Sequence, residues 1–177
     1  WGAYKKPREA TWLVGAVLLI LTLAYGLTGY LLPWDNRAYW GTVVTVQITG
    51  SAPILGPHIQ RLLGADGGNI GAITFARFYA IHVLVLPPIT ALLIAFHVYL
   101  VRKHGVAPQP GETATKKFYP SQVFKDTVAI FAAFAGLVAM SIVAKVPLGN
   151  LADPTDTSYI PRPEWYFLFL FQLLKLF

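Results

Sequence analysis

Three long apolar runs constrain this chain more than any other feature. They lie at about residues 12–32, 74–101 and 127–146. A helix needs about 20 apolar residues to cross the hydrocarbon core of a bilayer, and each run reaches that length. A fourth apolar stretch begins near residue 165 and continues to residue 177. The sequence therefore predicts an all-α transmembrane helical bundle, with three full spans and the start of another.

Composition supports a lipid environment for these runs. Charged residues make up 12% of the chain and the mean hydropathy is +0.54, whereas a soluble domain of 177 residues needs a more charged surface. The formal net charge of +6 comes from basic residues that flank the apolar runs, which indicates membrane topology rather than nucleic-acid binding. The sequence contains no cysteine, which excludes disulfides, thiolate metal sites and covalent haem attachment within these residues.

The segments between the runs predict the topology. Residues 35–73 carry glycines, prolines and short apolar stretches, a pattern that favours short amphipathic helices on the membrane surface or folded onto the bundle. Within the second run, Pro87 and Pro88 predict a kink rather than an end, because apolar residues continue on both sides. Basic residues precede the first run and fill the loop at 102–125, so both segments are expected on the cytoplasmic, stromal or matrix side.

Two histidines stand out inside the second run. His82 and His97 are 15 residues apart, which corresponds to roughly 22 Å of helical rise and an azimuth difference of about 60°. Ionisable residues inside a span are costly and usually functional, and neutral imidazole is a good axial ligand for haem iron. The pair is consistent with two haems stacked across the bilayer, and equally with two histidines that hydrogen-bond neighbouring helices. His58 and His104 lie at the wrong depth to supply the second ligands.

Three segments resemble the cytochrome b family. GLTGYLLPWDNRAYWG at 26–41 is similar to the end of its third helix and the following loop. ARFYAIHVLVLPPITALLIAFHVYLVRKHG at 76–105 resembles its fourth helix, and YIPRPEWYFLFLF at 159–171 contains the Pro-Glu-Trp-Tyr motif of its quinol-oxidation site. The resemblance covers the third helix to the start of the sixth, so we expect the chain to be a piece of a longer protein. The resemblance divides the chain into an N-terminal haem-binding part, residues 1–105, and a C-terminal part, residues 106–177.

The sequence also indicates which type of cytochrome b the chain resembles. The 15-residue histidine spacing resembles chloroplast-type and many bacterial cytochromes b. The phrases FYPSQVFKD and ADPTDTSYIPRPEWYFLFLFQLLK resemble fused bacterial versions, in which the quinol motif follows on the same chain. The resemblance implies a multi-pass protein of the bacterial cytoplasmic membrane. Several such proteins use menaquinol, which makes menaquinone one candidate for the quinone.

Haem roles follow from the resemblance. His82 is implied to ligate a low-potential haem b near the positive side, and His97 a high-potential haem b near the negative side, with the second axial ligands outside this chain. Arg77 resembles a position that pairs with a haem propionate, and its alternative role is an interfacial anchor. Gly15 and Gly29 share one helix face and resemble glycines that let haem approach the helix, although small-residue packing explains them nearly as well.

The basic pair that follows His97 has two interpretations. Arg102 and Lys103 could contact the propionates of the high-potential haem or a quinone at a second site. They could equally be positive-inside anchors. The sequence does not decide between these roles.

Glu164 is the candidate proton acceptor in the quinol-oxidation motif. Oxidation of a quinol releases protons, and a carboxylate beside apolar neighbours at the interface could accept one. The alternative is a glutamate that caps a helix after Pro163. Tyr166 is expected to act with Glu164. The remaining pocket wall is implied to include Gly41, Pro53, Ile54, Pro163 and Trp165.

The resemblance implies an enzyme subunit with defined partners. It would oxidise quinol near the positive side, pass one electron to a Rieske-type iron–sulfur protein, and carry the other across the membrane, coupled to proton translocation. A c-type cytochrome subunit and a homodimeric complex in membrane lipid are also implied. Two other classes stay open on the residues alone: a transporter with a histidine proton relay, and a structural subunit without cofactors. A visible spectrum separates them.

Overall fold

The computed structural model describes residues 2–107, 117–147, 149–162, 164–169 and 172. Within these ranges the regular elements are helices, and the one β-type pairing is an isolated bridge between Asp35 and Leu151. The all-α prediction is therefore confirmed.

Three helices are long and apolar enough to cross a membrane, as the sequence predicted. The first is α1. The second combines α4, a π-helical turn (η2) and α5, and the third combines a second π-helical turn (η3) with α6. Their bounds are Glu9–Tyr30 for α1, Ala72–Ala80 for α4, Ile81–Val85 for η2, Leu86–His104 for α5, Phe118–Gln122 for η3 and Val123–Val143 for α6.

The second span continues through its two prolines by widening just before them. The Leu86 N–H donates to the Ile81 carbonyl, five residues earlier, which makes a π-helical turn. Pro87 and Pro88 have no N–H to donate, so a local change in hydrogen bonding lets the helix continue. His82 lies inside this turn. Such π-helical turns often occur at functional sites.

The third span begins earlier than the sequence predicted. We expected the helix to start near Thr127 and placed Lys125 in the preceding loop, whereas α6 starts at Val123 and includes Lys125. The first turn carries Lys125 and Asp126, and the Gln122 amide donates to the Asp126 carboxylate over 2.7 Å, which supports the start of the helix. The negative charge of Asp126 also suits the N-terminal end of a helix. Hydropathy alone underestimates the length of a helix whose first turn carries charged residues.

The region between the first two spans folds into the short helices that the sequence predicted. These are α2 (Asn36–Gly50), α3 (Gly56–Leu63) and the 3-10 turn η1 (Asp66–Gly68). They pack at one end of α1 and α4 around a small core, in which Phe78 and Leu31 are fully buried. The other buried members of this core are Tyr39, Val46, Ala65 and Ile70.

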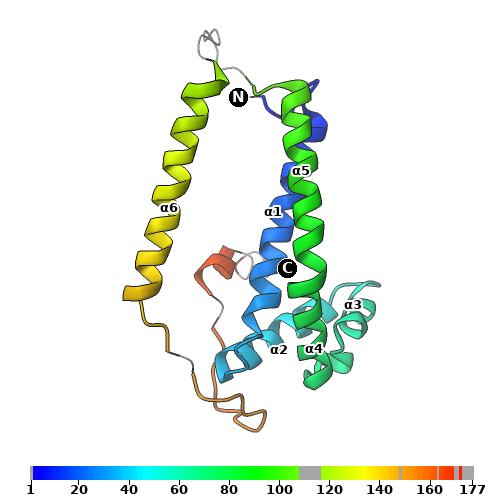
Figure 1. Ribbon diagram of the computed structural model, residues 1–177. Coiled ribbons are helices and arrows are strands. Elements are labelled where there is room, and N and C mark those ends of the chain that lie inside the picture. Colours follow the sequence, from blue (N-terminus) through cyan, green and yellow to red (C-terminus); the bar gives the residue numbers. More distant parts are fainter. Residues whose placement is uncertain (1, 108–116, 148, 163, 170–171, 173–177) are drawn as a thin grey trace.

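The spans are arranged as a close pair and a separate helix. Helices α1 and α5 lie side by side, whereas α6 stands apart from them (Figure 1). Side chains of α6 such as Phe131 and Leu137 are about two-thirds exposed. Apolar exposure on this scale suits lipid or further helices rather than water.

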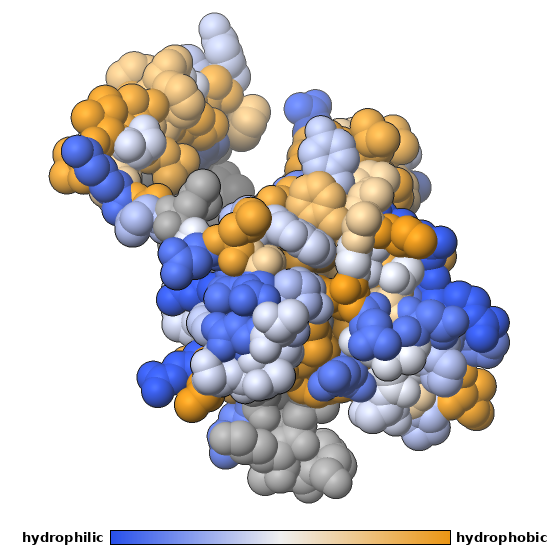
Figure 2. All heavy atoms as spheres, turned by 90° about the horizontal axis from the view of Figure 1, so that it is seen from below, coloured by the Kyte–Doolittle hydropathy of each residue, from blue (hydrophilic) through white to orange (hydrophobic). Residues whose placement is uncertain are grey.

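The two ends of the molecule differ in composition. The N-terminal end of α1 and the C-terminal end of α5 lie together (Figure 1), so the basic residues before α1 and after His97 share one end, as predicted. Helices α2 and α3 lie at the opposite end. Figure 2 shows many hydrophilic side chains gathered on that end face. A polar end face and apolar helix sides are what a membrane-spanning bundle requires.

Candidate functional site

Each of the two histidines in the second span faces a glycine of α1. A Cβ added to Gly15 would lie 3.2 Å from Cε1 of His97, and one added to Gly29 would lie 2.8 Å from Cε1 of His82. The glycines therefore leave room for the imidazole rings at two levels of the same helix pair. This pairing explains why both small residues lie on one face of α1.

His82 is held by polar and aromatic contacts. Its Nδ1 lies 2.9 Å from Oγ1 of Thr28 on α1. Its ring also meets the Tyr25 ring edge-on, with 5.3 Å between centroids. Neither Thr28 nor Tyr25 was predicted from the sequence, because both contacts depend on the alignment of α1 with the second span.

His97 faces an open cavity at the other end of α1. The cavity measures about 670 Å³ and is lined by residues that include Arg8, Trp12, Gly15 and His97. Nδ1 of His97 and Oγ1 of Thr11 are buried without a hydrogen-bond partner among the described residues. An apolar cavity with a histidine nitrogen, a cationic residue and a glycine opposite the ring suits haem, which needs a nitrogen ligand and polar groups for its propionates.

The two arginines with predicted haem roles lie in different surroundings. Arg77 of α4 donates hydrogen bonds to the backbone carbonyls of Arg61 and Leu62, the latter at 2.8 Å. It thereby stabilises the C-terminal end of α3, where carbonyls lack helical partners. Arg102 is exposed near the end of α5 and does not line the cavity at His97. Lys103 is exposed beside it.

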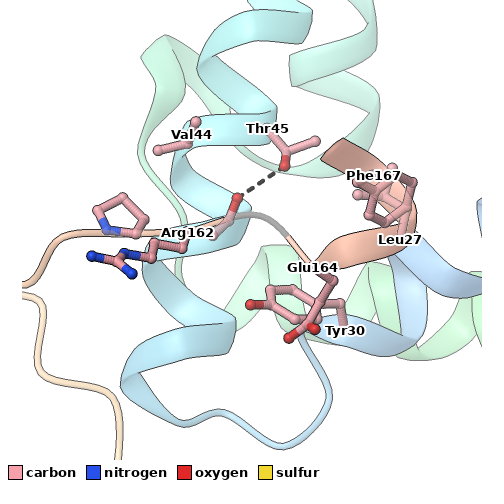
Figure 3. Close-up of a pocket in the computed structure, with 9 residues that line it drawn as sticks. Leu27, Tyr30, Val44, Thr45, Arg162, Glu164 and Phe167 are labelled. Carbon is pink, nitrogen blue, oxygen red and sulfur yellow. Dashed lines mark hydrogen bonds between the residues drawn. The ribbon is translucent and has the colours of Figure 1, made fainter. Parts of the chain in front are cut away.

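A second cavity lies at the other end of the molecule, between α1, α2 and the C-terminal segment, which contributes Pro161, Arg162, Glu164 and Phe167. Figure 3 shows its wall, with the side chains of Tyr30 and Glu164 next to one another. Gly41 of α2 permits a close approach, since an added Cβ would lie 2.6 Å from Cε1 of Tyr30. The lining residues are Leu27, Tyr30, Gly41, Val44, Thr45, Pro161, Arg162, Glu164 and Phe167.

Glu164 is the acidic group of this cavity. Its Oε1 forms an ion pair with Nη1 of Arg37 at 3.2 Å, and the Glu164 side chain is 25% exposed. The Tyr30 hydroxyl is buried and has no hydrogen-bond partner among the described residues. The cavity, about 30 Å³ in volume, therefore presents an acceptor and a phenolic hydroxyl beside apolar walls, groups that can hydrogen-bond a ligand hydroxyl. Neither Arg37 nor Tyr30 was predicted from the sequence.

The other predicted pocket residues lie around this cavity or away from it. Tyr166 packs near Gly26 of α1, where an added Cβ would lie 3.6 Å from its ring. Trp165 is 78% exposed and meets the Tyr166 ring edge-on. Pro53 and Ile54 are exposed in the turn after α2 and do not line the cavity. Pro163 lies outside the described residues.

The loop that leads to Glu164 is tied to the start of α2. Asp35 caps α2 by accepting a hydrogen bond from the Ala38 N–H at 2.8 Å, and its other oxygen accepts from the Gly149 N–H at 3.2 Å. The next residue, Asn36, accepts from the Asp153 N–H at 2.6 Å. Hydrogen bonds from the hydroxyl and the backbone of Thr155 hold the pKa of the Asp153 carboxyl below its usual value. These contacts position the segment that precedes Glu164.

Comparison with known proteins identifies relatives along the whole chain. A family profile described as cytochrome b (N-terminal)/b6/petB matches residues 1–153. The cytochrome bc complex cytochrome b subunit of Chlorobaculum thiosulfatiphilum is 35% identical over 98% of this chain, and the cytochrome b of Rhodobacter capsulatus is 35% identical over 100% of it. The menaquinol:cytochrome c reductase cytochrome b subunit of Geobacillus thermodenitrificans is 46% identical over 60% of it. The matches cover 42%, 44% and 47% of these relatives, respectively, so the chain spans less than half of their length.

Proposed function

The chain belongs to the cytochrome b family, and from this membership we propose that it forms part of the haem-carrying, quinol-oxidising subunit of a cytochrome bc-type complex. The proposed activity is a quinol:cytochrome c, or related acceptor, oxidoreductase that is coupled to proton translocation. Residues 1–105 would form the haem-binding part, and residues 106–177 would contribute to quinol oxidation.

One observation carries the proposal: two histidines on one span each face a glycine of α1. The 15 residues between them correspond to roughly 22 Å along the helix, so the two sites lie at different membrane depths. His82 and His97 would each ligate one haem b through a ring nitrogen, with the opposite axial ligands outside this chain. Gly29 and Gly15 would keep the helix surface open beside them. Haem supplies a one-electron carrier when bound.

Arginines at the two levels would complete the haem sites. Arg77 lies near the His82 level and has further N–H groups to donate, because a guanidinium carries five and two contacts are made to α3. It would hold a propionate near the end where α2 lies. At the His97 level, Arg8 lines the cavity and would hold a propionate, while Arg102, exposed outside the cavity, would assist from its rim.

The cavity at Glu164 is the proposed quinol site. A quinol hydroxyl would give its proton to the Glu164 carboxylate, with the Tyr30 hydroxyl as a second hydrogen-bonding group. The apolar side chains of Leu27 and Phe167 would exclude water from the ring. Gly41 would let the Tyr30 ring lie close against α2 at the cavity wall, while Tyr166 would support the segment from its place against α1. Trp165, Pro163, Pro53 and Ile54 are proposed for the outer wall.

Partners and location follow as part of the proposal. A Rieske-type iron–sulfur protein and a c-type cytochrome subunit would accept electrons, within a homodimeric complex. Menaquinol is the proposed reductant, because one relative is named for menaquinol and cytochrome c. Three helices apolar enough to span a membrane support a multi-pass protein. We place it in the bacterial cytoplasmic membrane.

The experiment is a haem count on the purified complex that contains this chain. Extraction and a pyridine haemochrome spectrum should give two haem b for each copy of the chain. His82→Leu and His97→Leu should each reduce the count, because each removes one proposed ligand. A wild-type complex without haem b would exclude the proposal and return the histidines to a hydrogen-bonding or proton-relay role.

A further inference from the structure

Thr28 connects the backbone of α1 to the ring of His82. Its side chain is buried, with 6% of its surface exposed. Oγ1 lies 2.7 Å from the Ala24 carbonyl oxygen and 2.9 Å from Nδ1 of His82. One hydroxyl therefore makes a local helical contact and a contact across 54 residues of sequence.

These two distances determine which ring nitrogen carries the hydrogen. A carbonyl oxygen can only accept, so the Thr28 hydroxyl donates its single hydrogen to Ala24. The same oxygen must then accept from His82, which requires a hydrogen on Nδ1. In a neutral imidazole the other nitrogen, Nε2, is left with its lone pair. That is the form in which Nε2 can ligate iron.

Neighbouring residues restrict the ring further. Tyr25 meets the His82 ring edge-on at 5.3 Å between centroids, one helical turn from Thr28. Gly29 leaves no side chain beside Cε1. Three positions of α1 within five residues therefore determine the place and tautomer of one histidine.

His97 has no equivalent arrangement. Its Nδ1 is buried and lacks a hydrogen-bond partner among the described residues. Gly15 of α1 faces its ring and has no side chain to offer. The two histidines, similar in sequence context and in facing a glycine, thus differ in one hydrogen bond.

We propose that Thr28 is a positioning residue for His82, which fixes the Nδ1–H tautomer and makes Nε2 a stronger electron donor to the haem iron. This inference rests on the proposed function, since it requires that His82 ligates haem. An acceptor at Nδ1–H raises the basicity of a ligating imidazole. A more basic ligand favours oxidised iron. The hydrogen bond therefore lowers the midpoint potential at His82 relative to that at His97.

The test is Thr28→Val in the intact complex, with a potentiometric titration followed by visible absorbance. Valine keeps the shape of threonine and removes the acceptor. The haem count should stay at two, and the lower midpoint potential should rise. At a fixed ambient potential, the ratio of reduced to oxidised haem at that site should increase by about fivefold, the typical net effect of one hydrogen bond. The upper potential should not move.

Two further variants control for packing. Thr28→Ser keeps the hydroxyl and should retain the wild-type potential. Thr22→Val removes a hydroxyl that donates to the Leu18 carbonyl on the same helix, is exposed and does not contact a histidine, so both potentials should stay unchanged. If Thr28→Val does not assemble, Thr28→Cys replaces it, because cysteine is small and only a weak hydrogen-bond acceptor. The Thr28→Cys variant should raise the lower midpoint potential in part.

The outcomes separate this inference from the proposed function. A wild-type complex with no haem b contradicts the proposed function itself. The role of Thr28 is overturned if two haems are present and Thr28→Val leaves both potentials at their wild-type values. Thr28→Cys is judged in the same way if it is the variant that assembles. Either result leaves the haem assignment intact. An equal shift in Thr22→Val also overturns it, because the effect would then come from general changes in α1.

Discussion

Arg37 of α2 and Glu164 of the C-terminal segment form an ion pair, with 3.2 Å between Nη1 and Oε1. The pair joins the helix that follows the first span to the residue proposed to accept a proton from quinol. The Arg37 side chain is 65% exposed, so the pair contributes little to stability. Its significance is for the chemistry of Glu164: the carboxylate must leave or share this partner when it takes up a proton.

Glu164→Gln should slow quinol oxidation by on the order of 100-fold, because the amide cannot accept a proton and general-base groups contribute at least that much. Steady-state quinol:cytochrome c activity over a range of pH measures the effect. Asp126→Asn, which changes an exposed carboxylate of α6, is the control and should retain wild-type turnover. Unchanged turnover in Glu164→Gln would exclude its role as base.

Arg37→Gln should slow quinol oxidation, because it removes the ion-pair partner that holds the Glu164 carboxylate at the cavity, and steady-state activity measures the effect. Thermal unfolding should change by less than about 1 kcal/mol, because the Arg37 side chain is 65% exposed. In the Arg37→Gln, Glu164→Gln double variant the effects should not add. Additive effects would show that the two residues act separately.

Gly29→Ala should disturb the proposed haem site at His82 more than Gly15→Ala disturbs the proposed site at His97. The added Cβ would lie 2.8 Å from the ring in the first case and 3.2 Å in the second, so only the first requires the ring to move substantially. Haem content and the two midpoint potentials measure the difference. A Cβ added to Gly136 on α6 would have no heavy atom within 4 Å, so Gly136→Ala should be neutral or slightly stabilising. Equal loss of haem in all three variants would contradict this account.

Asp35→Ala should weaken both the start of α2 and the approach of the loop to Glu164. The change removes a helix cap and a hydrogen bond from Gly149, so the expected loss of stability is about 1–2 kcal/mol. Quinol KM should rise as the loop loosens. Asp35→Asn keeps an acceptor at the cap and should lie close to wild type. A stable Asp35→Ala protein with normal KM would show that the loop is positioned by other contacts.

Much of the fold could be predicted from the sequence because lipid imposes simple rules. Length and hydropathy located the three spans, and glycine and proline located the short helices between them. Helical periodicity predicted that His82 and His97 face the same general direction, and both face α1. The start of α6 was placed too late, because the polar first turn with Lys125 and Asp126 resembles a loop in a hydropathy pattern.

The contacts that complete the sites could not be predicted in the same way. Thr28 and His82 are 54 residues apart, and their meeting depends on how α1 is aligned with the second span. Arg37 meets Glu164 across a long loop that hydrogen bonds of Asp35 and Asn36 hold against the start of α2. The pairing of each glycine with one histidine likewise requires the helix packing, although the small residues were a visible signal.

The most direct test of the central claim is a reduced-minus-oxidised visible spectrum of the purified complex that contains this chain, recorded through a redox titration. We expect a b-type α-band that titrates in two steps, one for a haem at His82 and one for a haem at His97. A preparation with intact subunits and no b-type absorbance would contradict it.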